Sequence, residues 1–119
     1  MNVTTFPYKF VCLFVKTVPP IIIESQTSSD TTVEEHHRAV LRCAAKGVPK
    51  PKVTWRREDN RNINLGLFGG QKYSALTADG PELNLTQVTR DDMGAYLCIA
   101  SNGVLPSLSK RILLHVNCE

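Results

Sequence analysis

The sequence has little of what nucleic-acid-binding proteins and membrane proteins display. Its net charge is only +3, and its lysines and arginines are scattered instead of forming a basic tract. Nucleic-acid binding therefore has little support. The only signal-like apolar stretch, residues 10–15, is shorter than the core of a secretory signal and far shorter than a membrane span. We expect no direct membrane insertion by this chain, and we expect an export signal and an anchor to lie elsewhere in a longer protein.

Catalytic and metal-binding motifs are also missing. The sequence has no nucleophile elbow, no HExxH-type zinc motif and no phosphate-binding glycine loop, and Gly69-Gly70 is interpreted as a simple loop. Residues 34–37 read Glu-Glu-His-His, but adjacent side chains on an extended chain point to opposite faces, so a solvated turn is the better interpretation. His115 is interpreted as a surface residue. We expect no enzyme activity, no cofactor and no metal.

What the sequence does contain is the period-2 alternation of half-buried strands. No useful stretch has helical periodicity, which favours an all-β sandwich over a mixed fold. A polar, glycine-bearing segment at 58–70 predicts a loop or a weak edge hairpin between two sheets. The alternating segments are residues 39–45, 52–56, 83–86, 96–100 and 112–116.

The length of 119 residues leaves room for one domain with a single core. Residues 1–18 lack clear periodicity, and Pro19-Pro20 then imposes an extended conformation that commonly marks entry to a domain. We therefore expect a poorly ordered leader or remnant at 1–18 and a folded domain at 19–117.

Two cysteines, a tryptophan and a tyrosine follow a distinctive spacing. Trp55 lies 12 positions after Cys43, Cys98 lies 55 after Cys43, and Tyr96 precedes Cys98 by two. With the segments 47–55 and 92–98, this pattern resembles I-set immunoglobulin domains. The resemblance implies an immunoglobulin-like (I-set) β-sandwich of two antiparallel sheets. It also implies a Cys43–Cys98 disulfide between the sheets, Trp55 packed against it in the core, and Tyr96 in a tyrosine corner.

A narrower likeness lies in residues 93–103 and 107–112, which resemble the second immunoglobulin domain of insect lachesins and Dpr-interacting proteins. This resemblance implies an extracellular, cell-surface role in neuronal, synaptic adhesion or recognition. It also implies cell-surface immunoglobulin-domain proteins as partners, including a second copy of the chain. Members of that family typically carry three tandem domains and a membrane anchor, and their first domain dominates binding. The alternatives are a structural intracellular I-set module of muscle type and a secreted immune-type binder.

A candidate protein interface follows from the facing of the strand at 96–100. If Tyr96 and Cys98 point inward, Leu97 and Ile99 must point outward. The same alternation on the neighbouring strands predicts a mixed apolar and basic face, and the alternative interpretation is a face without a binding role. Its members are Thr54, Arg56, Leu97, Ile99, Arg111 and Leu113.

Two asparagines and two further cysteines are candidates for covalent modification or pairing. Asn84-Leu85-Thr86 is an N-glycosylation sequon, and the alternation of Asn84 with its leucine neighbours places it toward solvent. Asn2-Val3-Thr4 is a second sequon in a less favourable terminal context. Cys12 and Cys118 are expected to lie near opposite poles of the sandwich, too far apart to pair with each other.

Overall fold

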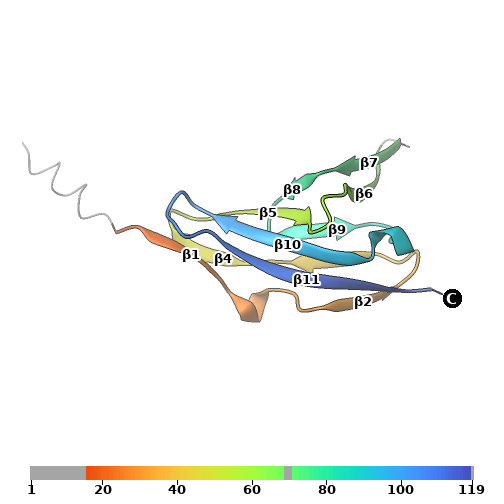
Figure 1. Ribbon diagram of the computed structural model, residues 1–119, viewed down its shortest axis with the longest axis horizontal. Helices are drawn as coiled ribbons and strands as arrows, with labels where there is room; N and C mark the ends of the chain where they lie inside the picture. Colours follow the sequence, from red (N-terminus) through yellow and green to blue (C-terminus); the bar gives the residue numbers. More distant parts are fainter. Residues whose placement is uncertain (1–15, 69–70, 119) are drawn as a thin grey trace, which may run out of the picture.

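The computed structural model describes residues 16–68 and 71–118, and in this part of the chain it confirms the all-β sandwich (Figure 1). The described residues contain two short 3-10 helices, η1 (Glu24–Gln26) and η2 (Arg90–Asp92), and no α-helix. The main sheet has five strands in the order β2-β11-β10-β5-β8. Their bounds are Thr31–Glu34 for β2, Leu108–Asn117 for β11, Gly94–Ser101 for β10, Lys52–Arg57 for β5 and Thr77–Asp79 for β8.

The second layer of the sandwich consists of two antiparallel strand pairs. β1 (Val18–Ile22) pairs with β4 (Ala45–Val48), and β3 (Ala39–Arg42) pairs with β9 (Glu82–Leu85). The alternating apolar residues of both layers are buried in one core, as a period of two requires when each sheet has one covered face. The core includes Leu41, Leu83 and Leu85 from the second layer and Tyr96, Ile112 and Leu114 from the main sheet.

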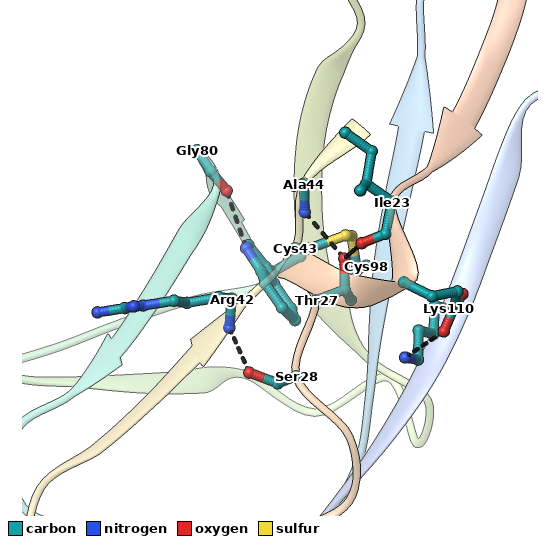
Figure 2. Close-up of a disulfide and its surroundings, with 11 residues drawn as sticks. Ile23, Thr27, Ser28, Arg42, Cys43, Ala44, Gly80, Cys98 and Lys110 are labelled. Carbon is teal, nitrogen blue, oxygen red and sulfur yellow. Dashed lines mark hydrogen bonds and ion pairs between the residues drawn. A yellow bond between two sulfur atoms is a disulfide. The ribbon is translucent and has the colours of Figure 1, made fainter. Parts of the chain in front are cut away.

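The centre of the core is the Cys43–Cys98 disulfide, which joins the two layers (Figure 2). Trp55 is fully buried and lies directly opposite Cys98 in the β5–β10 register. Its indole nitrogen donates a hydrogen bond of 2.9 Å to the carbonyl oxygen of Gly80, so the ring's only polar atom is satisfied inside the fold.

The strand predicted at 39–45 is interrupted at Cys43 and Ala44. At this point β3 ends its pairing with β9 and β4 begins its pairing with β1. The N–H of Cys43 donates to the carbonyl oxygen of Pro81 at 2.9 Å. The N–H of Ala44 donates to Oγ1 of Thr27 at 3.1 Å (Figure 2). The change of partner strand, which the alternation does not reveal, is the reason for the break.

The prediction of two antiparallel sheets is wrong at one edge. β2 lies parallel to β11, with Thr32 opposite His115 and Val33 opposite Val116. The chain leaves β1 through η1 and joins the other layer without a reversing turn, so β2 runs toward the same pole as the last strand (Figure 1). A parallel pair needs a connection longer than a hairpin, and here almost the whole domain supplies it.

The segment after β5 forms a hairpin, which settles the choice between a loop and a hairpin. β6 (Ile63–Phe68) pairs with β7 (Gln71–Ala75) and projects beside the sandwich (Figure 1). Ile63 at its base is fully buried. The predictions for residues 1–15 of the expected leader, for Asn2, Cys12 and for Gly69-Gly70 lie outside the described residues.

Candidate protein-binding site

Three neighbouring strands of the main sheet present one flat surface, here called the outer face. In the β10–β5 and β10–β11 registers Leu97 lies between Arg56 and Arg111, and Ile99 is opposite Thr54. The residues between these positions are buried, so the outward positions share the side away from the core. The structure therefore brings the predicted interface positions together on one surface, with Leu113 opposite Ala95 at its far end.

The apolar part of the outer face is partly screened by its neighbours. Leu97 and Ile99 are half-buried, while Leu113 is exposed at 38% of its surface. Their cross-strand neighbours, which include Arg56 and Arg111, lie about 5 Å away, close enough for long side chains to reach them. The face offers a small apolar centre.

The rim of the outer face carries both signs of charge, which corrects the predicted basic character. The Nε atom of Arg111 lies 2.9 Å from Oε2 of Glu58, and Nζ of Lys52 lies 3.6 Å from Oδ2 of Asp79. Glu58 continues the outward alternation of Thr54 and Arg56, so its place could have been predicted. The place of Asp79 could not be predicted from a local sequence pattern, because it depends on the pairing of β8 with β5.

One buried charged side chain beneath the outer face was not predicted from the sequence. Arg57 is 2% exposed and its guanidinium is paired with Asp59 through bonds of 3.1 and 2.9 Å. It also donates to the carbonyl oxygens of Asp91, at 2.9 Å, and Met93, at 3.0 Å. Its carbon Cζ lies 5.4 Å from the ring centre of Tyr96, within the range of a cation–π contact. The alternation of Val53 and Trp55 continues to position 57, but a charged residue at the end of an alternating strand is normally exposed.

The pKa values follow from this geometry. Burial opposes the charge of Arg57, but the hydrogen bond to Asp59 and the nearby acidic groups outweigh it, so the pKa of Arg57 is raised. The hydrogen bond from Arg57 is the main reason that the pKa of Asp59 is lowered. Burial raises the pKa of Tyr96 to about 12. All three shifts keep the network in one protonation state across the physiological range.

Tyr96 forms the expected corner. Its hydroxyl donates a bond of 2.6 Å to the carbonyl oxygen of Asp92 in η2. The side chain of Asp92 caps this turn by accepting from the N–H of Thr89, at 2.8 Å, and from Nδ2 of Asn64, also at 2.8 Å. Gly94 has φ +147°, and a Cβ atom there would lie 3.0 Å from Arg57 Nη2, so the arginine passes over a glycine. These contacts hold the turn at 89–93 against the buried side of the strands that form the outer face.

The remaining candidate residues, the three histidines, are spread over the surface of the described part of the chain. His36 and His37 are exposed in the turn after β2, and His115 is exposed on β11. No group of three or more His, Cys, Asp or Glu residues there could hold a metal ion. A hollow of about 830 Å³ between the β6–β7 hairpin and residues 86–92 is lined by polar groups, of which Asp92 is already bonded within the turn.

Asn84 and Cys118, the modification and cysteine candidates within the described residues, are at the surface. Asn84 is exposed at the middle of β9, opposite Val40 of β3, and the leucines on both sides of it are 1% exposed. Cys118 is exposed and carries no disulfide to any described residue. Among the described residues, no helix has the length and apolar character needed to cross a membrane.

The sandwich, its cross-linking disulfide with the buried tryptophan, and the tyrosine corner define an immunoglobulin domain. The chain belongs to this family: the family model described as "Immunoglobulin domain" matches residues 19–102. Lachesin from Schistocerca americana is 35% identical over 98 residues, which are 82% of this chain and 26% of lachesin.

Two solved structures are more similar in sequence. DIP-gamma Ig1+Ig2 is 46% identical with a TM-score of 0.80, covering 84% of this chain and 49% of that chain. A structure of Dpr2 Ig1-Ig2 in complex with DIP-Theta Ig1-Ig3 is 45% identical with a TM-score of 0.78, covering 84% of this chain and 32% of that chain. The resemblance to lachesins and Dpr-interacting proteins, drawn from residues 93–103 and 107–112, is thereby confirmed. The chain spans only about a quarter to a half of the length of these relatives.

Proposed function

We propose that this chain is an extracellular module of a neuronal cell-surface adhesion or recognition protein, and that it binds proteins and has no catalytic activity. The observation that carries the proposal is its 45% identity to a chain of the Dpr2–DIP-Theta complex, in which immunoglobulin-domain proteins bind one another. The partners we propose are cell-surface immunoglobulin-domain proteins, including a second copy of this chain.

The extracellular location is supported by the disulfide. Cys43 and Cys98 are 1% and 0% exposed and close a loop of 55 residues. Disulfides of this kind persist in oxidising compartments and are rare in the cytosol. A muscle-type intracellular module would keep both thiols reduced, and a secreted immune-type binder would not be attached to the cell surface.

Two measurements on native protein, captured with an antibody raised against the chain, separate these three locations. Peptide mapping without reducing agent should show residues 43 and 98 linked, and the protein should fractionate with plasma membranes. Free thiols would favour the intracellular module, while a linked pair in soluble, secreted material would favour the immune-type binder.

We further propose that the outer face is the contact surface. Its half-buried leucine and isoleucine form a flat apolar centre, and its rim carries paired charges of both signs, an arrangement typical of transient protein interfaces. The second candidate role is that of a spacer holding a binding domain away from the membrane, for which the outer face would have no partner.

The test is the double variant Leu97→Arg with Ile99→Arg. Two probes are used: a second copy of the chain, and a panel of Dpr-type immunoglobulin ectodomains. The matched control is Ile21→Arg with Val48→Arg, which also replaces two apolar residues, 48% and 46% exposed, on the β1–β4 pair. We expect the first variant to lose binding and the control to keep it. Equal affinity for both folded variants would reject the outer face and leave the spacer role.

A further inference from the structure

We propose that Asn84 carries an N-linked oligosaccharide, and that this sugar covers the β3–β9 surface and leaves the outer face as the protein-accessible side of the domain. The proposal rests on the extracellular location proposed above, because the modification takes place in the secretory pathway. It assigns a role to a motif that the binding function does not use.

The chemistry of the site is complete within three residues. Asn84-Leu85-Thr86 has the Asn-X-Thr form with a non-proline residue in the middle. The amide nitrogen Nδ2 would bond to the anomeric carbon of a lipid-pyrophosphate-linked oligosaccharide. The bond between that carbon and the pyrophosphate oxygen breaks, the lipid pyrophosphate leaves, and the amide gives up one proton.

The Asn84 amide differs from the other well-placed asparagines. Nδ2 of Asn64 donates to Asp92, and Nδ2 of Asn102 donates to the carbonyl oxygens of Val18 and Pro49, each at 2.8 Å. Within the described residues the Asn84 side chain makes no hydrogen bond of this kind, and it is exposed. An amide with a structural role would donate such hydrogen bonds. The Asn84 amide donates none of them to a described residue, so its nitrogen is free to be modified.

The position of Asn84 decides which surface the sugar covers. Leu83 and Leu85 point into the core, so the side chain between them points away from it, on the far side of the sandwich from Leu97. Its neighbours on that surface are the Arg42–Glu82 ion pair and the half-buried Val40. A bulky, hydrated glycan there excludes a protein partner from the β3–β9 surface.

The first experiment detects the glycan directly. The chain is secreted from eukaryotic cells behind a heterologous signal and digested with trypsin, which releases residues 73–90 with Asn84 as the only asparagine. We expect this peptide to be missing at its unmodified mass and to appear, with aspartate at position 84, after peptide N-glycosidase treatment. Thr86→Ser should keep the modification, whereas Thr86→Ala and Asn84→Gln should remove it, and Asn2→Gln should leave peptide 73–90 unchanged.

The second experiment tests the coverage with two matched glutamates. Glu82 lies beside Asn84 and Glu58 lies on the outer face; both are paired with an arginine, and their side chains are 55% and 48% exposed. Carbodiimide labelling of Glu82 should be faster in Asn84→Gln than in the glycosylated chain, whereas labelling of Glu58 should be equal. Equal rates at both positions would reject the coverage.

The outcomes separate this inference from the proposed function. An unmodified 73–90 peptide in protein whose Cys43–Cys98 disulfide has formed would overturn the glycan and leave the extracellular function standing. Free thiols in native protein would instead overturn the extracellular location, whatever the glycan does in the secreted chain.

Discussion

Replacing Arg57 by methionine is the sharpest test of how the outer face is held in place. The guanidinium donates to two backbone carbonyls of the turn at 91–93 and to the carboxylate of Asp59. Methionine fills a similar volume but donates nothing. The turn that presents Tyr96 would then lose its anchor to β5.

The loss of unfolding free energy in Arg57→Met depends on how many hydrogen-bond acceptors are left without a donor. A hydrogen bond to a charged group contributes about 1.5–3 kcal/mol, and two carbonyls lose such a donor. Both are only partly buried and can regain some water, so the lower end applies and the loss of unfolding free energy is about 3 kcal/mol. Asp59 adds no cost to this sum, because its half-exposed carboxylate returns to solvent. The expected loss is a large part of the ~5–15 kcal/mol that stabilises a typical domain.

The assay is urea unfolding followed by Trp55 fluorescence, with the disulfide intact. The control is Arg56→Met, since Arg56 is exposed on the outer face and makes no ion pair among the described residues; it should change stability by less than about 0.5 kcal/mol. Arg57→Lys should lie in between, because one ammonium cannot replace the planar fork. If Arg57→Met were no less stable than Arg56→Met, the hydrogen bonds of Arg57 would contribute nothing measurable to the free energy of unfolding. That result would refute the estimate of about 3 kcal/mol.

Three further predictions concern stability. Since the pKa of Tyr96 is raised to about 12, the free energy of unfolding should be highest below about pH 10 and should fall by about 2–3 kcal/mol as the pH rises to 12. Urea unfolding measured at several pH values should show a smaller fall in Tyr96→Phe. An identical fall in that variant would contradict the prediction. Replacing Cys43 and Cys98 by alanine should cost about 4 kcal/mol of unfolding free energy through the released 55-residue loop, and a loss too small to measure would refute that origin. Gly66→Ala should lower the melting temperature, because Gly66 has φ +96° and a Cβ there would overlap Oγ1 of Thr86; an unchanged melting temperature would show that the hairpin adjusts freely.

The sequence predicted the outer face well because the period of a strand fixes which residues point outward. Once Cys98 is assigned to the core, the places of Leu97 and Ile99 follow, and the observed register agrees. The charges on the rim were predicted less well. Asp79 reaches the face only because β8 pairs with β5 across a separation of 25 residues, and no local pattern encodes that contact.

The unpredicted features share a physical cause. Arg57 was missed because a charged residue at the end of an alternating strand is normally exposed, and its burial depends on acceptors 34 and 36 positions away. The break at Cys43 depends on Thr27 and Pro81, and the parallel edge depends on where η1 directs the chain. Each is decided by partners distant in sequence, which single-strand periodicity cannot report.

Arg56 and Arg57 show how this domain separates its stabilising contacts from the surface proposed to bind a partner. They are consecutive residues of β5, yet the first lies on the rim of the outer face and the second is buried beneath it against Tyr96. Because strand side chains alternate, the residue at 56 can be substituted to suit a binding partner without disturbing the hydrogen bonds made by the residue at 57. The strands β5, β10 and β11 can therefore vary their outward residues and keep the same core, provided that Arg57 continues to hold the turn. Binding specificity in this domain should consequently change through outward positions such as Arg56, Leu97 and Arg111, while substitutions at 57 should reduce binding only by unfolding the surface that presents them.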